Sequence, residues 1–227
     1  MRVIIMKNIK KISLIIFDMD GLMLDTERIS MEALQKASRR YGYKITQNVV
    51  FKMIGMNSQG CEAIFRESFG DSFPLNDIRK LKSKFASRII NKTGIPVKAG
   101  LYELLEFLKQ KPVLIAVATS TAKKSAEKLL ESAHILDKFH LIVYGDEVTE
   151  GKPDPEIFLK VADKLNCKPE ECIVFEDSEN GIIAAARAKM IPIMIPDMKE
   201  PSNEIEILSH RKFKTLLDAK EYLKEYL

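Results

Sequence analysis

Side chains able to act on phosphate groups occur at four places in this 227-residue sequence. They are Asp18–Asp20 with Gly21, Thr119–Ser120, Lys152, and Glu176–Asp177. Two carboxylates that are two residues apart on an extended segment face the same side. One of them, Asp18, can attack phosphorus, while Asp20 protonates the leaving oxygen and later activates water. The hydroxyl and main-chain amide of Thr119 and the ammonium of Lys152 are suited to hold phosphate oxygens. Together these residues predict phosphoryl transfer through an aspartyl-phosphate intermediate.

The acidic side chains also predict a metal site. Carboxylates gathered in one place repel one another, and a divalent cation relieves that repulsion. Only oxygen ligands are present, which favours a hard ion, and Mg²⁺ suits a substrate that brings phosphate oxygens. We expect Asp18 and Asp177 to be direct ligands, together with the main-chain carbonyl of Asp20. Glu176 is expected either as a ligand or as a group that supports the ligands.

Short apolar runs precede most of these polar positions and predict strands buried on both faces. The runs are 12–17, 112–118, 140–144, 172–175 and 191–195. Helical patterns lie between them, which predicts an α/β fold with a doubly wound parallel sheet. In such a sheet the residues that follow the strands meet at the carboxyl edge, where ligands bind. Each feature alone has a simpler explanation, since Ser120 or Thr121 could be a helix N-cap, but all four fall at strand ends in a consistent order.

One long segment between the first two strands departs from this alternation. Residues 28–97 contain helical patterns without a convincing strand, which predicts a helical subdomain inserted into a core formed by 1–27 and 98–227. The inserted segment carries 13 Lys or Arg against 5 Asp or Glu. This surplus fits either a solvated helix surface or an anionic ligand.

Four sequence motifs resemble those of the haloacid dehalogenase superfamily. The motifs are IIFDMDGLMLDTER, AVATS, GKPDPEIF and VFEDSENGI. The resemblance covers essentially the whole chain and is greatest to the branch that contains β-phosphoglucomutase and small sugar-phosphate or pseudouridine 5′-phosphatases. It implies a Rossmann-like core, a helical cap and a phosphoric monoester hydrolase. It also implies the nucleophile role for Asp18, the acid/base role for Asp20, phosphate contacts from Gly21, Thr119, Ser120 and Lys152, and Mg²⁺ held by Asp18, Asp20, Glu176 and Asp177.

Departures from the mutase pattern favour water as the final acceptor of the phosphoryl group, which means hydrolysis. By this resemblance, the mutases have a histidine where this chain has Ser30. They also have an arginine that binds the second phosphate where this chain has Ser58, and a lysine where it has Ala122. Lys123 is adjacent and could replace that lysine. We therefore expect a phosphatase acting on a sugar phosphate or a nucleoside monophosphate. A β-phosphoglucomutase-type mutase is the alternative, and a non-catalytic phospho-ligand-binding or signalling module is a remote one.

The composition narrows the other possibilities. The three cysteines form no metal or disulfide pattern, and no apolar run reaches the roughly 20 residues that a membrane span needs. Basic and aromatic residues do not interleave as stacking sites for nucleic acid would require. We therefore expect a cytoplasmic monomer that binds a small phosphorylated metabolite, with no nucleic-acid or membrane partner.

Overall fold

The computed structural model describes residues 11–53 and 58–227. Its contacts divide these residues into two compact units, one within 11–24 and 97–227 and the other within 25–96. The second unit is inserted in the sequence between the two halves of the first. Within the described residues, none of the helices combines the length and apolar composition needed to span a membrane.

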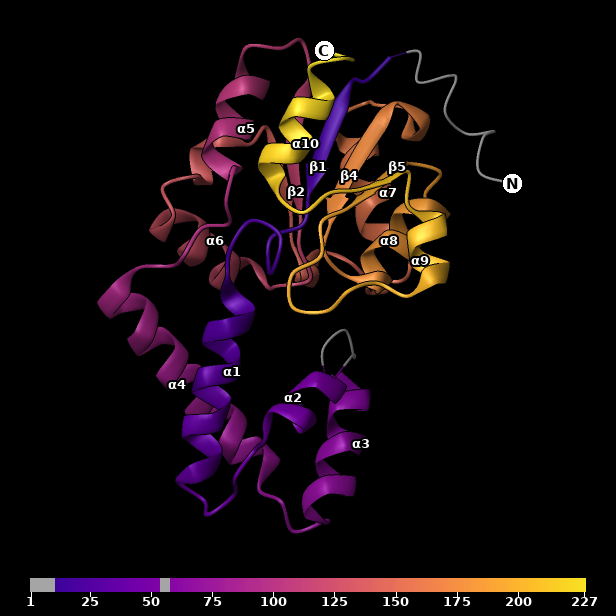
Figure 1. The fold of residues 1–227 in the computed structure, drawn as a ribbon. Coiled ribbons are helices and arrows are strands. Elements are labelled where there is room, and N and C mark those ends of the chain that lie inside the picture. Colours follow the sequence, from indigo (N-terminus) through magenta and orange to yellow (C-terminus); the bar gives the residue numbers. More distant parts are fainter. Residues whose placement is uncertain (1–10, 54–57) are drawn as a thin grey trace. The chain divides into compact units, whose positions relative to one another are not determined.

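The first unit is built on a six-stranded sheet whose strands all run parallel, in the order β3-β2-β1-β4-β5-β6 (Figure 1). The strands are β1 (Leu14–Phe17), β2 (Leu114–Ala118), β3 (Leu141–Val143), β4 (Cys172–Glu176), β5 (Ile191–Met194) and β6 (Arg211–Lys212). The doubly wound parallel sheet predicted from the sequence is confirmed. β6 was not predicted, because it consists of two exposed, charged residues and has no apolar run.

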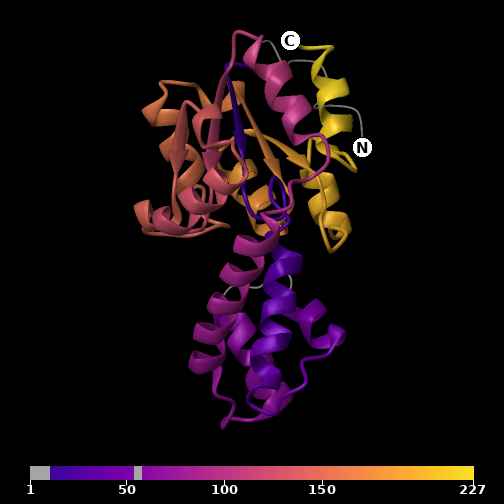
Figure 2. The same ribbon diagram turned by 90° about the vertical axis from the view of Figure 1, so that its left-hand side faces the viewer.

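Helices cover both faces of this sheet (Figure 2). They are α5 (Leu101–Lys109), α6 (Lys123–Ser132), α7 (Glu156–Lys164), α8 (Glu179–Arg187), α9 (Asn203–Leu208) and α10 (Leu216–Leu223), with short 3₁₀ turns at Leu136–Lys138, Gly145–Glu147 and Pro169–Glu171. Alternate strand residues such as Ile16 and Val174 pack against Phe158 of α7 and Ala184 of α8 in one apolar cluster. α5 and α10 pack together on the opposite side. Because both faces are covered, β1, β2, β3 and β5 are apolar throughout, and β4 is apolar up to Glu176 at its end.

The inserted unit is helical. It contains α1 (Thr26–Arg39), α2 (Gln47–Met53), α3 (Ser58–Phe69) and α4 (Leu75–Thr93). Its core includes Leu34, Phe65, Phe73 and Ile78. The rings of Phe65 and Phe73 stack with their centroids 5.0 Å apart. The role of this unit as a cap stays a prediction.

The start of α6 differs from the sequence-based expectation. Ser120 or Thr121 was expected to cap α6, but the N-cap is Ala122 and it makes no side-chain cap bond. The amide of Lys123 instead donates to Asp146 Oδ1 at 3.0 Å. A carboxylate from the loop after β3 therefore satisfies the start of this helix, and the Thr121 hydroxyl is left for another partner.

Candidate active site

The parallel register brings the first predicted residues together. Phe17 of β1 lies beside Phe175 of β4 and Val117 of β2. The next residues along these strands, Asp18 and Glu176, are therefore neighbours at the carboxyl edge of the sheet.

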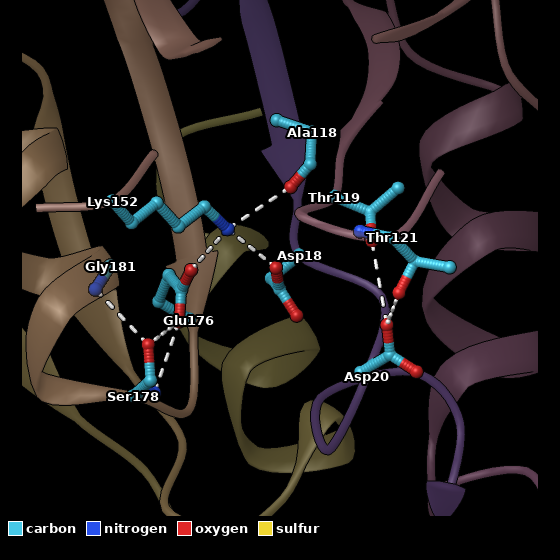
Figure 3. Close-up of polar contacts among 9 residues, drawn as sticks. All are labelled: Asp18, Asp20, Ala118, Thr119, Thr121, Lys152, Glu176, Ser178 and Gly181. Carbon is cyan, nitrogen blue, oxygen red and sulfur yellow. Dashed lines mark hydrogen bonds and ion pairs between the residues drawn. The ribbon is translucent and has the colours of Figure 1, made fainter. Parts of the chain in front are cut away.

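Lys152 links these strand ends (Figure 3). Its Nζ donates to Asp18 Oδ1 at 2.5 Å, to Glu176 Oε1 at 2.6 Å and to the Ala118 carbonyl at 3.1 Å. Only 6% of the Lys152 side chain is exposed. Burial alone would lower the pKa of Lys152, but the charges of Asp18 and Glu176 outweigh burial and raise it. Lys152 is therefore held as a cation beside the predicted nucleophile.

Glu176 is held by groups on both of its carboxylate oxygens. Oε1 accepts from Lys152, and Oε2 accepts from the Ser178 amide at 3.0 Å and the Ser178 hydroxyl at 2.9 Å. Ser178 is also the N-cap of α8, accepting from the Gly181 amide at 3.0 Å. A Cβ on Gly181 would lie 1.9 Å from the Glu176 carboxyl carbon, so any larger residue here would displace this carboxylate. Sequence reasoning missed this support.

A carboxylate cluster at the same edge fits a divalent cation. Asp18, Glu176 and Asp177 each offer an oxygen, and these oxygens all lie within 4.8 Å of one another. Burial raises the pKa of Asp18 to about 8 despite the opposing effect of Lys152, and Glu176 and Asp20 raise it further. Burial and the charges of Glu176 and Asp18 likewise hold the pKa of Asp177 well above its usual value. The donor set is all oxygen and is short of positive charge, which is the chemistry that a hard divalent cation supplies.

Asp20 lies on the other side of Asp18 from Glu176 (Figure 3). Its Oδ2 accepts a 2.7 Å hydrogen bond from the Thr121 hydroxyl, while the Thr119 hydroxyl is 3.4 Å away. Thr119 is fully buried, and its hydroxyl oxygen accepts from the Thr121 amide at 3.0 Å. Two of the predicted residues, Asp20 and Thr119, are thus close together, and Thr121 makes a hydrogen bond to each of them. The sequence had suggested Thr121 only as a helix cap.

The main-chain donors differ from the prediction. The Gly21 amide donates to the Leu24 carbonyl at 2.9 Å and the Thr119 amide to the Val143 carbonyl at 3.1 Å, so neither is free for a phosphate oxygen. Within residues 11–53 and 58–227, the amides of Met19, Asp20 and Ser120 make no hydrogen bond. Unpaired amides at this edge of the sheet suit an oxyanion.

Gly21 lies close to Asp177, and its predicted phosphate contact stays a prediction. Its φ is +84°, and a Cβ there would lie 2.2 Å from Asp177 Oδ2. Glycine thus lets the backbone turn close to the Asp177 carboxylate. Ser120 is exposed, and its carbonyl packs against Gly145.

The fold and the residues at this sheet edge are typical of a hydrolase of the Rossmann-like α/β class with an Asp-x-Asp motif after its first strand. The sequence profile of the family described as haloacid dehalogenase-like hydrolases matches residues 15–195 of this chain. The chain belongs to this family.

Individual relatives agree with that membership. A Thermotoga maritima protein named "Phosphorylated carbohydrates phosphatase" is 35% identical over 77% of this chain and 80% of its own length. A Drosophila melanogaster protein named "Probable pseudouridine-5'-phosphatase" is 31% identical over 84% of each chain. The solved structure of β-phosphoglucomutase from Clostridium difficile superposes with a TM-score of 0.74 at 25% identity, covering 94% of this chain and 96% of that one. The predicted family and enzyme class, a phosphoric monoester hydrolase, are confirmed.

Proposed function

We propose that this protein is a Mg²⁺-dependent phosphatase that hydrolyses a small phosphorylated metabolite, either a sugar phosphate or a nucleoside monophosphate. The observation that carries the proposal is the arrangement of Asp18 between the Lys152 ammonium on one side and Asp20 on the other. A nucleophile, a cation and an acid/base group within one edge of the sheet are the parts that hydrolysis through an aspartyl phosphate requires.

In the proposed first step, an Asp18 carboxylate oxygen bonds to phosphorus and the bond to the leaving oxygen breaks. Asp20 gives its proton to that leaving oxygen. In the second step Asp20 takes a proton from water, the water oxygen bonds to phosphorus, and the Asp18 carboxylate is released with inorganic phosphate. Lys152, the Thr119 hydroxyl and the amides of Met19, Asp20 and Ser120 would hold the phosphate oxygens.

We assign the Mg²⁺ ligands to Asp18, Asp177 and the Asp20 carbonyl, with Glu176 acting mainly through Lys152. The reason is that both Glu176 oxygens already accept hydrogen bonds. When bound, the cation would neutralise the carboxylates and offset the charge of the phosphate oxygens.

Lys123 bears on the choice between hydrolysis and mutase chemistry. Its Nζ is 3.9 Å from Glu127 Oε1 and 5.7 Å from the ring centroid of Tyr144, and 61% of the side chain is exposed. The ammonium is therefore engaged with its own helix and a neighbouring ring, which weighs against its replacing the mutase lysine absent at Ala122. Ser58, where the resemblance places the mutase arginine, begins α3.

A phosphate-release screen tests the proposal. Purified protein with Mg²⁺ is assayed against sugar phosphates and nucleoside monophosphates, with Asp18→Asn as the inactive control and a chelator as the metal control. We expect release that depends on both Asp18 and Mg²⁺. Steady conversion of β-glucose 1-phosphate into glucose 6-phosphate with little free phosphate would instead establish a mutase.

A further inference from the structure

The Thr121 hydroxyl donates a hydrogen bond to Asp20. The two residues are 101 positions apart in sequence, yet Thr121 Oγ1 lies 2.7 Å from Asp20 Oδ2. That separation is the usual value for a hydroxyl–oxygen hydrogen bond, whereas the 3.4 Å distance from Thr119 Oγ1 is long. Thr121 therefore makes the stronger of the two hydroxyl contacts to Asp20.

The backbone of Thr121 is fixed from two sides. Its amide donates to Thr119 Oγ1 at 3.0 Å, and its carbonyl accepts from the Gly145 amide at 3.1 Å. Gly145 itself packs so closely that a Cβ there would lie 2.1 Å from the Ser120 carbonyl oxygen. The loop after β2 therefore packs tightly against the loop after β3. With the backbone fixed, the Thr121 hydroxyl can move mainly by rotation of its side chain.

A helix-capping role does not explain this residue. The N-cap of α6 is Ala122, and the first amide of the helix is satisfied by Asp146. Removing the Thr121 hydroxyl would therefore leave the start of α6 intact and would change only the contact to Asp20.

The two oxygens of Asp20 differ as a result. Oδ2 is occupied by the threonine hydroxyls, whereas Oδ1 makes no hydrogen bond in the part of the chain that the structure describes. A carboxyl group that accepts on one oxygen carries its transferable proton on the other. The contact thus determines which Asp20 oxygen exchanges protons and in which direction it points.

We propose that Thr121 is a positioning residue for general acid catalysis: its hydroxyl holds Asp20 Oδ2 so that Oδ1 delivers the proton to the leaving oxygen. This inference rests on the proposed function, since it assigns a support to the acid in that reaction. In the supported step the P–O bond to the leaving group breaks as the Asp18–phosphorus bond forms, and the proton moves from Asp20 Oδ1 to the leaving oxygen.

The dependence on the leaving group tests the proposal. Phenyl phosphate and p-nitrophenyl phosphate have similar shapes, but phenolate is the more basic leaving group and needs the proton more. We measure kcat/KM, which reports the steps up to leaving-group departure, for the wild type, Thr121→Val and Thr121→Ser. Thr93→Val is the matched control, because this exposed hydroxyl donates to the carbonyls of Ile89 and Gly94 in the helical unit and, among residues 11–53 and 58–227, to no other group.

The expected result is selective. Thr121→Val should lower kcat/KM for phenyl phosphate by about 10- to 100-fold, the usual effect of losing a hydrogen bond to a charged group. The loss for p-nitrophenyl phosphate should be several times smaller. Thr121→Ser, which keeps the hydroxyl, should recover most of the activity on both substrates, and Thr93→Val should match the wild type. Thermal melting of Thr121→Val should stay near the wild-type value.

Three outcomes would overturn the inference. They are equal losses on the two substrates, no loss on either, and a serine variant as impaired as the valine variant. Failure of the proposed function has a different signature, in which the wild type releases phosphate from neither compound or Asp18→Asn releases it from both. That result would remove the acid step and this inference with it.

Discussion

Replacing Gly181 by alanine sets two effects of opposite sign against each other. Gly181 lies in the first turn of α8, and alanine is more favourable than glycine in a helix by up to about 1 kcal/mol. The added Cβ, however, would lie 1.9 Å from Glu176 Cδ and Oε1, where ordinary contacts begin at 3.4 Å. The Glu176 carboxylate must therefore retreat by about 1.5 Å, the difference between these two distances.

Such a retreat separates Glu176 Oε1 from Lys152 Nζ, which are 2.6 Å apart. Breaking a buried ion pair costs about 3–5 kcal/mol, which exceeds the gain in helix propensity. We expect the free energy of unfolding to fall by about 2–4 kcal/mol after the helix gain is subtracted. Displacing Lys152 by about 1 Å should lower kcat/KM about 100-fold.

The assay combines urea denaturation with Mg²⁺-dependent phosphate release. Gly151→Ala is the matched control, because a Cβ there meets nothing within 4 Å, and it should behave as the wild type. Adding Glu176→Asp to Gly181→Ala shortens the acidic side chain and should recover part of the lost stability. A Gly181→Ala variant that is more stable than the wild type and fully active would refute the placement of Glu176 against this helix.

Three further predictions concern the charges around Asp18. Lys152→Met should lower the free energy of unfolding by about 3–5 kcal/mol in metal-free protein and by less with saturating Mg²⁺, as measured by urea denaturation. Gly21→Ala and Gly42→Ala should both lose about 1–2 kcal/mol because φ is positive at both, but only Gly21→Ala should weaken Mg²⁺ binding in calorimetry, since only its Cβ meets Asp177. Without metal, the melting temperature should fall as pH rises from 3.8 towards about 8, because Asp18 binds its proton more tightly folded than unfolded, and Mg²⁺ should flatten this dependence.

Each of these predictions has a contrary result. Equal losses for Lys152→Met with and without Mg²⁺ would mean that the lysine does not offset the same charges as the cation. Equal Mg²⁺ affinity in the Gly21→Ala and Gly42→Ala variants would contradict the close approach of Asp177 to Gly21. A melting temperature that rises over the stated pH range in metal-free protein would contradict the raised pKa of Asp18.

The sheet could be predicted because its strands are apolar on both faces, as in 172–175, and helical patterns separate them. The polar residues after these strands could be located for the same reason, since parallel strands end at one edge. β6 escaped prediction because its pairing with β5 depends on the tertiary structure and not on a local apolar pattern.

The support around the site could not be predicted from local patterns. Thr121 has the sequence signature of a helix cap, and only the fold shows that Asp146 takes the capping role while Thr121 reaches Asp20. The contact of Gly181 could not be predicted either. A glycine in a helix indicates that some group packs closely against it, but the sequence does not show which group. That group is Glu176, which lies at the end of a strand.

The most direct test of the central claim is to locate the phosphoryl group during turnover. Wild-type protein with Mg²⁺ and a hydrolysed phosphate ester is quenched in acid and treated with borohydride, which reduces an acyl phosphate to the alcohol. Peptide mass spectrometry then identifies the modified residue. We expect homoserine at position 18, dependent on substrate and reduced in amount when the quench is delayed until the substrate is exhausted. Active turnover with an unmodified Asp18, or reduction at another carboxylate, would contradict the assignment of Asp18 as the nucleophile.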